Sequence, residues 1–418
     1  ARSKRQSRPS QARRPVQELS SQVVSGPFAT ALLTLMGADV IKFERPPGDE
    51  SRSFCISPEL LAQGAGSAFI ALNCGKRSVS LDLKHPRAIE AVRRLVAGAD
   101  VVVENYRPGV MARLGLGYAA LKEVRPDLIY CSISGYGQEG PEVASPAYDG
   151  AIQAASGIMS ITGTTEGGPM RVGFPFSDAA TGSSAALAIS GALFRRQREG
   201  KGQYIDLAMV HASLSMMTQI VAFTSVAGVV PGQIGNMAWS RRPTSDLFRA
   251  ADGSLMFVVN SEPHYALLFR TLGRPEVLED PRFATWALRS QNVAALRAII
   301  EEALATDTVA NWERRLKAAG VAVAQVKNIG QALASPQMAH RNLLQTVPGP
   351  PGVDRPVTVM NAPFLGDEDG PRVERAAPGI GEHNAEVLAE AGYSPEELAA
   401  FAREGAFWQA PARARAPA

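Results

Sequence analysis

The chain has 418 residues, of which 45% are hydrophobic and 20% are charged, and its formal net charge is +3. This composition is typical of a globular protein with a large core, and the length is enough for two domains. So small a net charge gives no argument for nucleic-acid binding, and no apolar run approaches the ~18 residues that would indicate a membrane span. The three cysteines (Cys55, Cys74, Cys131) have no metal spacing, which predicts reduced thiols in a cytoplasmic protein.

The start of the chain is basic and contains no acid before Glu18. Within the first 14 residues every charge comes from lysine or arginine: Arg2, Lys4, Arg5, Arg8, Arg13 and Arg14. Such a start resembles an organelle transit peptide, which would place the protein in mitochondria if the organism is eukaryotic. The charges show no amphipathic pattern, so we prefer a disordered basic tail over residues 1–15. We expect Pro411 to Ala418 to be disordered as well.

Residues 16–226 alternate short apolar runs with helical patterns, which predicts an α/β large domain with a parallel sheet. The expected strands are 38–44, 78–83, 100–104, 128–134 and 203–205. The expected helices are 27–36, 88–97, 178–198 and 207–226. The last of these helices is apolar and contains His211, which the pattern predicts to be a core histidine.

A smaller α+β domain is predicted over residues 246–342, between linkers at 227–245 and 343–356. The first linker is rich in Gly, Pro, Ser and Arg, and the second holds four prolines within residues 348–356. Asp252-Gly253 predicts a hairpin over residues 246–260. Helical patterns follow at 262–272, 290–305 and 308–319, and again at 387–401. Residues 357–418 therefore return to the large domain, with a disordered tail.

Two familiar kinds of site are not favoured by the sequence. Gly135 to Gly140 fits G-x-G-x-x-G after a strand, but Pro141 and Pro146 oppose the helix that a dinucleotide site needs, so a tight loop is the better interpretation. The histidines are scattered, and none has a metal-ligand spacing, which argues against a metal site. They are His85, His211, His264, His340 and His383.

The segment from Tyr148 to Met209 is the most informative part of the chain. Asp178 stands between an apolar run and a helix of small residues, and it is the one carboxylate that looks placed for chemistry. It also fits an N-cap of the following helix, because Asp is favoured there. Both interpretations can hold together, since a helix N-terminus lowers the pKa of a carboxylate. For Asp149, catalysis and N-capping remain equally open.

At Asp178 the chain resembles the family III CoA-transferases, also called the CaiB/BaiF family, over about Val16 to Ala400. The resemblance rests on ordered motifs: Gly26 to Thr30, Gly37 to Arg45, Gly48-Asp49 with Arg52, Lys76 to Ser78, Leu81 to Leu83, Glu104 to Gly109, Ser177 to Gly182, Gly381 to His383 and Gly392 to Ser394. The chain departs from the family pattern before Val16, where members carry a Gly-(Ile/Val)-Arg-Val strand, so we expect the first strand to be short or differently built.

The resemblance implies an α/β fold in which both termini form a Rossmann-like large domain. A smaller α+β domain is held on the two linkers, and two such rings interlock as a homodimer. It also implies an enzyme that takes an acyl-CoA and a small organic acid as substrates, with no permanently bound cofactor, no metal, no nucleic acid and no membrane partner.

The resemblance also implies a set of site residues. The family's catalytic aspartate falls on Asp178, and the acid that assists it in some members falls on Asp149. Its CoA contacts fall on Val24, Leu81, Asn105 and Arg113. For Asn105, a role as a turn residue before Pro108 is a competing interpretation. The implied mechanism passes through an aspartyl anhydride and an aspartyl-CoA thioester.

Two other functions remain as alternatives. Racemases of the same family epimerise 2-methylacyl-CoA with a second acid/base, and they carry Gly-His-Asp where this chain has Ala147-Tyr148-Asp149, which favours the transferase. A non-catalytic CoA-binding protein is the other alternative. The acids are expected to be dicarboxylates, such as succinyl-CoA with a C4–C6 acid. The pair Arg241-Arg242 either meets an anionic substrate or is simply solvated.

Overall fold

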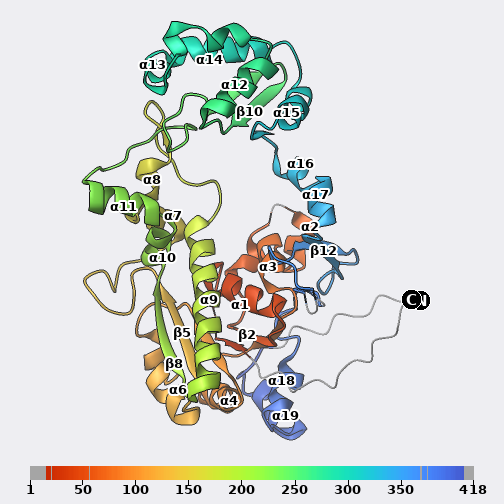
Figure 1. Ribbon diagram of the computed structural model, residues 1–418. Coiled ribbons are helices and arrows are strands. Elements are labelled where there is room, and N and C mark those ends of the chain that lie inside the picture. Colours follow the sequence, from red (N-terminus) through yellow and green to blue (C-terminus); the bar gives the residue numbers. More distant parts are fainter. Residues whose placement is uncertain (1–15, 20, 56, 368–369, 374, 409–418) are drawn as a thin grey trace. The chain divides into compact units, whose positions relative to one another are not determined.

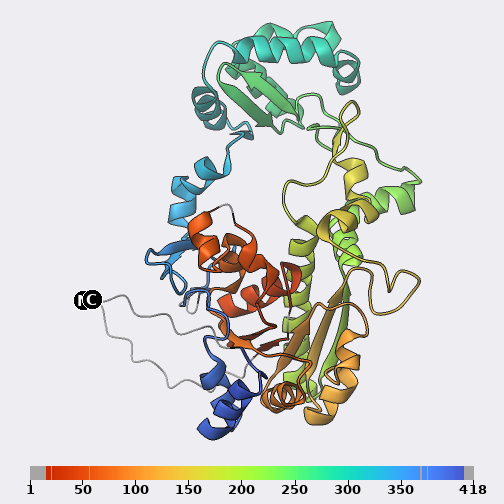
Figure 2. The ribbon, with the colours of Figure 1, turned by 180° about the vertical axis from the view of Figure 1, so that it is seen from behind.

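The computed structural model describes residues 16–408 except 20, 56, 368, 369 and 374, so both predicted disordered tails lie outside the described residues. The chain divides into two compact units (Figures 1 and 2). Described residues of the larger unit lie within Ala1–Met159, Arg171–Val230 and Ala339–Ala418. The smaller unit comprises Ser160–Met170 and Pro231–Met338. The chain thus leaves the larger unit and returns to it before its C-terminal end.

The larger unit is built on one six-stranded sheet in which every pairing is parallel. Its strands are β1 (Val16–Glu18), β2 (Val40–Glu44), β3 (Arg77–Ser80), β4 (Val101–Glu104), β5 (Ile129–Ser134) and β8 (Gln203–Ala208). Their order is β3-β2-β1-β4-β5-β8, which is the doubly wound order of a Rossmann-like domain, as the family resemblance implies. β1 has only three residues, yet it pairs with both β2 and β4 and so sits where the order reverses.

Both faces of this sheet are covered, as parallel sheets require. On β4, Val101 and Val103 join a core with α1 (Ser25–Leu35) and α9 (Phe176–Glu199). Val102 points to the opposite core, which helices α4, α6, α18 and α19 complete. These helices span Pro86–Ala97, Tyr118–Val124, Asn384–Glu390 and Pro395–Arg403. Figure 1 shows α9 running along β5 and β8, with α1 beside it.

Several elements of the larger unit differ from the sequence prediction. The predicted linker 343–356 contains a strand, because β12 (Leu344–Val347) pairs with β13 (Val357–Met360). The single helix predicted over 387–401 is broken between α18 and α19, where Gly392 has a φ of +84°. Short elements also went unpredicted: η1 (Glu50–Ser53), α2 (Pro58–Ala62), α3 (Ser67–Asn73), α5 (Val110–Arg113), α7 (Asp149–Ala155) and α8 (Ile158–Ile161).

The helix predicted over 207–226 is two helices, α10 (Met209–Met216) and α11 (Thr218–Ala227), bent by 80° at Met217. The prediction that His211 lies in the core is wrong. The buried face of α10 carries Met209, Ala212 and Ser213, so His211 lies on the exposed face. Among the described residues no single helix is long and apolar enough to cross a membrane. This bent pair passes that test by length and composition only.

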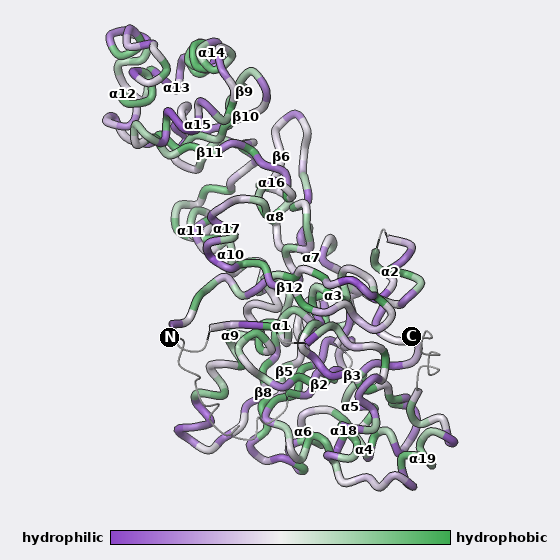
Figure 3. The backbone as a smooth tube through the Cα atoms, turned by 90° about the vertical axis from the view of Figure 1, so that its right-hand side faces the viewer, coloured by the Kyte–Doolittle hydropathy of each residue, from purple (hydrophilic) through white to green (hydrophobic). Residues whose placement is uncertain are grey.

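The smaller unit has a three-stranded antiparallel sheet of β9 (Leu247–Ala250), β10 (Gly253–Phe257) and β11 (Val323–Gln325). The hairpin predicted at Asp252-Gly253 joins β9 to β10. Its core is closed by helices, of which α14 is largely hydrophobic (Figure 3). These helices are α12 (Glu262–Thr271), α13 (Trp286–Gln291), α14 (Val293–Leu304) and α15 (Val309–Ala318), and the short turns η2 (Pro275–Leu278) and η3 (Pro281–Phe283) lie between α12 and α13. After β11 the chain continues through α16 (Ile329–Leu333) and α17 (Pro336–His340), which have no buried residues.

Residues 160–170, which the prediction assigned to the large domain, belong to the smaller unit. They form a two-stranded hairpin of β6 (Gly163–Thr164) and β7 (Gly168–Pro169). The physical reason lies in tertiary hydrogen bonds: the Gly235 amide donates to the Gly163 carbonyl, and the Gln233 side chain donates to the Thr162 carbonyl.

Candidate active site

A cavity of about 270 Å³ opens in the larger unit at the carboxyl ends of the parallel strands. Its walls come from the segments that follow β1, β4 and β5 and from the starts of α7, α9 and α10. β1 and β4 are neighbours at the point where the strand order reverses. Doubly wound sheets form their binding crevice at that point, because the segments following the two strands diverge there. Residues lining the cavity include Val24, Ser25, Asn105, Tyr148, Asp149 and Asp178.

Asp178 projects from the first turn of α9 and is half-buried. It is the third residue of the helix, and Pro175 occupies the N-cap position, so the N-cap interpretation of Asp178 is wrong. Burial, assisted by the negative charge of Asp149, raises the pKa of Asp178 to about 7, against a hydrogen bond from the Ser25 side chain that lowers it. A carboxyl group with this pKa is half ionised at neutral pH.

Asp149 caps helix α9, although it belongs to helix α7. It is the first residue of α7, and its Oδ1 accepts hydrogen bonds from the backbone amides of Ser177 (2.8 Å) and Asp178 (3.2 Å). Its Oδ2 accepts one from Gln153 Nε2 (2.7 Å). Asp149 therefore satisfies amides in the first turn of α9, which would otherwise lack partners within that helix.

Gln153 links this cap to the chain before α9, and no sequence pattern indicated this residue. Its side chain is completely buried. Its Oε1 accepts a hydrogen bond from the Val172 amide (2.9 Å), and its Nε2 donates to Asp149 as well as to the Phe174 carbonyl (3.3 Å). A glutamine four residues after an aspartate looks like a solvated helix face, so this role becomes visible only in the fold.

Two glycines allow close packing around the start of α1, because Gly182 of α9 faces the first turn of α1 and Gly26 faces Ser21. A Cβ on Gly182 would lie 2.7 Å from the Ser25 carbonyl oxygen and 2.9 Å from Phe28 Cδ1. A Cβ on Gly26 would lie 2.6 Å from Ser21 Cβ. Real side chains do not tolerate such distances, so glycine at 182 allows α9, which carries Asp178, to pack closely against Ser25.

Of the CoA contacts that the resemblance implies, Val24 and Asn105 line the cavity with Asp149 and Asp178. Leu81 does not, because its side chain is packed in the core on the other face of the sheet. Arg113 is exposed at the end of α5 and is also absent from the cavity lining.

Asn105 does not close a turn before Pro108. Its Oδ1 accepts a hydrogen bond from the Gln22 amide (2.8 Å), and its Nδ2 donates to the Gln22 carbonyl (2.9 Å). This pair of bonds joins the segment after β4 to the segment after β1. Asn105 thus holds one wall of the cavity against another.

The arginine pair of the predicted linker separates in the smaller unit. Arg242 stacks over the Trp286 ring, with its guanidinium carbon 4.2 Å from the ring centroid. Arg241 lines a second, more open cavity together with Arg249 and Arg297. Arg297 is already paired with Asp246 and with Glu301.

Comparison with known proteins identifies CoA-transferases, both by a family model and by individual relatives. The family model described as CoA-transferase family III matches residues 16–384. An acetyl-CoA:oxalate CoA-transferase of Acetobacter aceti is 38% identical, over 86% of this chain and 94% of its own. A succinate–glutarate CoA-transferase of Agrobacterium fabrum is 35% identical, over 88% of this chain and 93% of its own.

A solved structure extends this similarity to the fold. The crystal structure of a CaiB/BaiF family protein from Brucella suis superposes with a TM-score of 0.82 at 32% sequence identity. The match covers 90% of this chain and 98% of that one, so it includes both units. With the family model spanning the large and small units alike, the chain belongs to the family III CoA-transferases and is an enzyme of that family.

Proposed function

We propose that the protein moves CoA from an acyl-CoA donor to a carboxylic or dicarboxylic acid, with Asp178 as the nucleophile. The observation that carries this proposal is the half-buried carboxyl group of Asp178 in the switch-point cavity, with its pKa raised to about 7. A group with this pKa is ionised often enough to attack at neutral pH, and burial makes its carboxylate less solvated and more reactive.

The reaction follows from a carboxylate meeting a thioester. Ionised Asp178 attacks the acyl carbonyl carbon, the C–S bond breaks, and a mixed anhydride and the CoA thiolate result. The thiolate then attacks the aspartyl carbonyl, which releases the donor acid and leaves an aspartyl-CoA thioester. The carboxylate of the acceptor acid repeats the two steps in reverse. The thioester energy is conserved only while water is excluded from these intermediates.

The surroundings of Asp178 support this chemistry. Asp149 occupies the amides of Ser177 and Asp178, so the first turn of α9 is held rigidly while the Asp178 carboxyl stays accessible in the cavity. The cavity is also lined by Val24 and Ser25 at the start of α1, where backbone amides have no acceptor within the helix. Such amides are suited to stabilise an oxyanion, a contribution of about 3–4 kcal/mol per donor.

For the acids, we propose a dicarboxylate pair. Two of the relatives are named for oxalate and for succinate with glutarate, all of which are dicarboxylates. A racemase is disfavoured, because no histidine is among the residues that line the Asp178 cavity, and Tyr148 there is 73% exposed.

The test is to trap the adduct. The protein is mixed with succinyl-CoA without an acceptor, treated with hydroxylamine, and digested for mass spectrometry. We expect a hydroxamate on Asp178, and none in a folded Asp178→Ala variant. Glu199→Gln, at the exposed far end of α9, serves as the matched control and should retain the adduct.

Two further experiments identify the substrates and the reaction. In the first, the rate of CoA transfer to oxalate, succinate, glutarate and acetate is measured, and we expect the dicarboxylates to be preferred over acetate. Incubation of a 2-methylacyl-CoA in heavy water should give no deuterium at the α-carbon. The proposal would be overturned if the folded Asp178→Ala variant transferred CoA at the wild-type rate. Rapid exchange at the α-carbon with loss of stereochemistry would overturn it as well.

A further inference from the structure

We propose that a buried chain of charges, Glu18–Lys42–Asp49, positions the segment Gln22–Ser25, hereafter the β1 loop, at the wall of the Asp178 cavity. Lys42 and Asp49 are then positioning residues for the reaction, although neither lines the cavity. The expected effect of these residues on the transfer rate rests on the function proposed above. Their expected effect on the conformation of the β1 loop is independent of that function.

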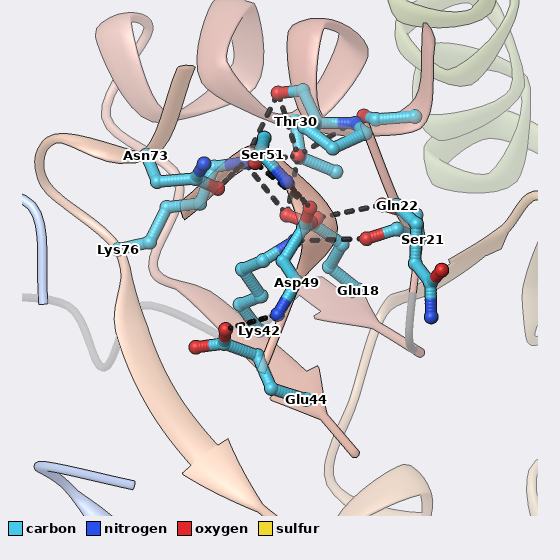
Figure 4. Close-up of polar contacts among 12 residues, drawn as sticks. Glu18, Ser21, Gln22, Thr30, Lys42, Glu44, Asp49, Ser51, Asn73 and Lys76 are labelled. Atoms are coloured by element: carbon cyan, nitrogen blue, oxygen red, sulfur yellow. Dashed lines mark hydrogen bonds and ion pairs between the residues drawn. The ribbon is translucent and has the colours of Figure 1, made fainter. Parts of the chain in front are cut away.

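The charges form one connected chain beneath the loop (Figure 4). Lys42 Nζ lies 2.8 Å from Glu18 Oε1 and 2.9 Å from Asp49 Oδ2. The side chains of Lys42 and Glu18 are completely buried, and that of Asp49 is 1% exposed. Bulk water therefore does not screen these contacts, and their geometry is fixed by the sheet, since Glu18 and Lys42 lie opposite each other on β1 and β2.

Each charged group of the chain also bonds to the loop or to Ser21, the residue before it. Lys42 Nζ donates a hydrogen bond to the Ser21 carbonyl (2.8 Å), and the Ser21 hydroxyl donates to Glu18 Oε1 (2.6 Å). Asp49 Oδ1 accepts a hydrogen bond from the Val23 amide (3.3 Å). Asn105 fixes Gln22 from the other side. The backbone is thus held at three consecutive residues.

The loop needs this support because its conformation is unusual. Val23 has a φ of +65°, in the left-handed region that β-branched residues rarely adopt. Such a conformation persists only where the surroundings enforce it. Two residues later the chain reaches Ser25, which lines the cavity together with Asp178 and starts α1. A loop relaxed at Val23 would move Ser25, and with it the amides at the start of α1.

A second cation ties the same chain to α1. Lys76 Nζ lies 2.7 Å from Glu18 Oε2 and donates hydrogen bonds to the Pro27 carbonyl (3.0 Å) and to Thr30 Oγ1 (2.8 Å). Glu18 therefore joins two lysines, one serving the β1 loop and the other serving the first turn of α1 (Figure 4). The loop and the helix are fixed to one buried carboxylate.

Glu18, Lys42 and Asp49 stay charged across the neutral range, whereas burial lowers the pKa of Lys76 to about 8. Burial opposes ionisation, but Lys42 and Lys76 lower the pKa of Glu18 to about 2. Lys42 likewise lowers the pKa of Asp49 against its burial, and the carboxylates raise the pKa of Lys42. Buried ion pairs can often be replaced by hydrophobic residues without loss of stability. Such residues would not supply the directed bonds to the Ser21 carbonyl and the Val23 amide.

Asp49→Asn discriminates positioning from a merely local role. Asp49 also caps η1 by accepting from the Ser51 amide, and asparagine is an equally good cap. Asparagine cannot, however, offer an oxygen both to the Val23 amide and to the Lys42 ammonium. The matched control is Asp39→Asn, which weakens the ion pair of Asp39 with Arg77 before the amino end of β2, away from the cavity.

Two measurements decide the outcome. Hydrogen exchange followed by mass spectrometry should show faster exchange in the peptide 21–26 of Asp49→Asn, with no change there in Asp39→Asn. In single-turnover reactions with succinyl-CoA, Asp49→Asn should form the Asp178 adduct about 10- to 100-fold more slowly, because small misplacements of reacting groups have effects of that size. The KM for succinyl-CoA should change far less than the rate.

The possible failures are distinguishable. If wild-type protein forms no adduct, the proposed function fails, and the exchange comparison still tests the positioning. If Asp49→Asn matches wild type in both measurements, the positioning proposal is overturned. If this variant does not fold, hydrogen exchange in the wild-type protein tests the positioning proposal by itself. The amides of Gln22 and Val23 must be protected from exchange, and rapid exchange there would contradict the proposal.

Discussion

At Asp178 opposing effects act on one carboxyl group. Burial and the charge of Asp149 raise its pKa, while the Ser25 side chain lowers it, and the result lies near 7. The first turn of a helix also favours a negative charge, but burial outweighs it here. Asp149 contributes in two ways, because the oxygen that caps α9 belongs to the carboxylate that repels Asp178.

This balance predicts the pH dependence of adduct formation. Attack requires the ionised form, so the single-turnover rate should rise with pH through a midpoint near 7 and then level off. Asp149→Asn removes the repelling charge, which should lower the pKa of Asp178 and move the rising limb to lower pH. The profile is measured by quenched reactions between pH 5 and pH 9. An unshifted limb in a folded Asp149→Asn protein would show that the charge of Asp149 does not reach Asp178.

At the scale of elements, the site depends on how closely α1 and α9 pack. The first turn of α1 meets α9 at Gly182, where a side chain would enter the space of Ser25 and Phe28. Farther along α9, the small residues Ala185 and Ala186 are buried against the sheet, together with Ile189. Burial of this face holds Asp178 at the cavity.

Gly182→Ala should therefore separate the two helices at the site. The added methyl group meets backbone at 2.7 Å, and we expect about 1–3 kcal/mol of destabilisation from overpacking. We also expect at least a tenfold slower adduct formation, in line with the effect of ~1 Å misplacements. Gly191→Ala on the same helix is the control. It has open space around it, so it should keep full activity and gain up to about 1 kcal/mol from helix propensity. Chemical denaturation and single-turnover rates measure both.

At the scale of the whole molecule, helix α11 exposes hydrophobic side chains that no other part of the described chain buries. No residue of α11 is buried, yet Val221, Phe223 and Val226 are hydrophobic and are 43%, 36% and 85% exposed. Exposed apolar surface of this kind marks an interaction site. The chain also leaves the larger unit and returns to it. We propose a homodimer of interlocked rings, as the family resemblance implies.

An interlocked dimer has a distinctive kinetic property, because its subunits cannot part without unfolding. Sedimentation at nanomolar concentration should show a dimer and no native monomer. Mixed populations of tagged and untagged chains should not exchange subunits in native buffer over days. They should exchange after denaturation and refolding, which serves as the positive control. Exchange under native conditions would contradict the topological link while leaving an ordinary dimer possible.

The sequence by itself determined the features that depend on short-range pattern. Apolar runs such as 100–104 and 128–134 predicted strands of a parallel sheet, and Asp252-Gly253 predicted its hairpin. The context of Asp178 and the ordered motifs indicated the CoA-transferase family. These signals work because strand and turn propensities, and motifs, are carried by residues adjacent in the chain.

Only the tertiary structure decided which polar groups meet. Asp149 caps a helix that begins 27 residues later, and Glu18 pairs with Lys42 and with Lys76, at separations of 24 and 58 residues. In the sequence these charges are indistinguishable from solvated ones, just as His211 is indistinguishable from a core histidine. A buried ion or amide group needs a hydrogen-bonding or ion-pair partner, and the fold decides which residue supplies it. That partner is set by strand order and helix packing, which no local pattern encodes.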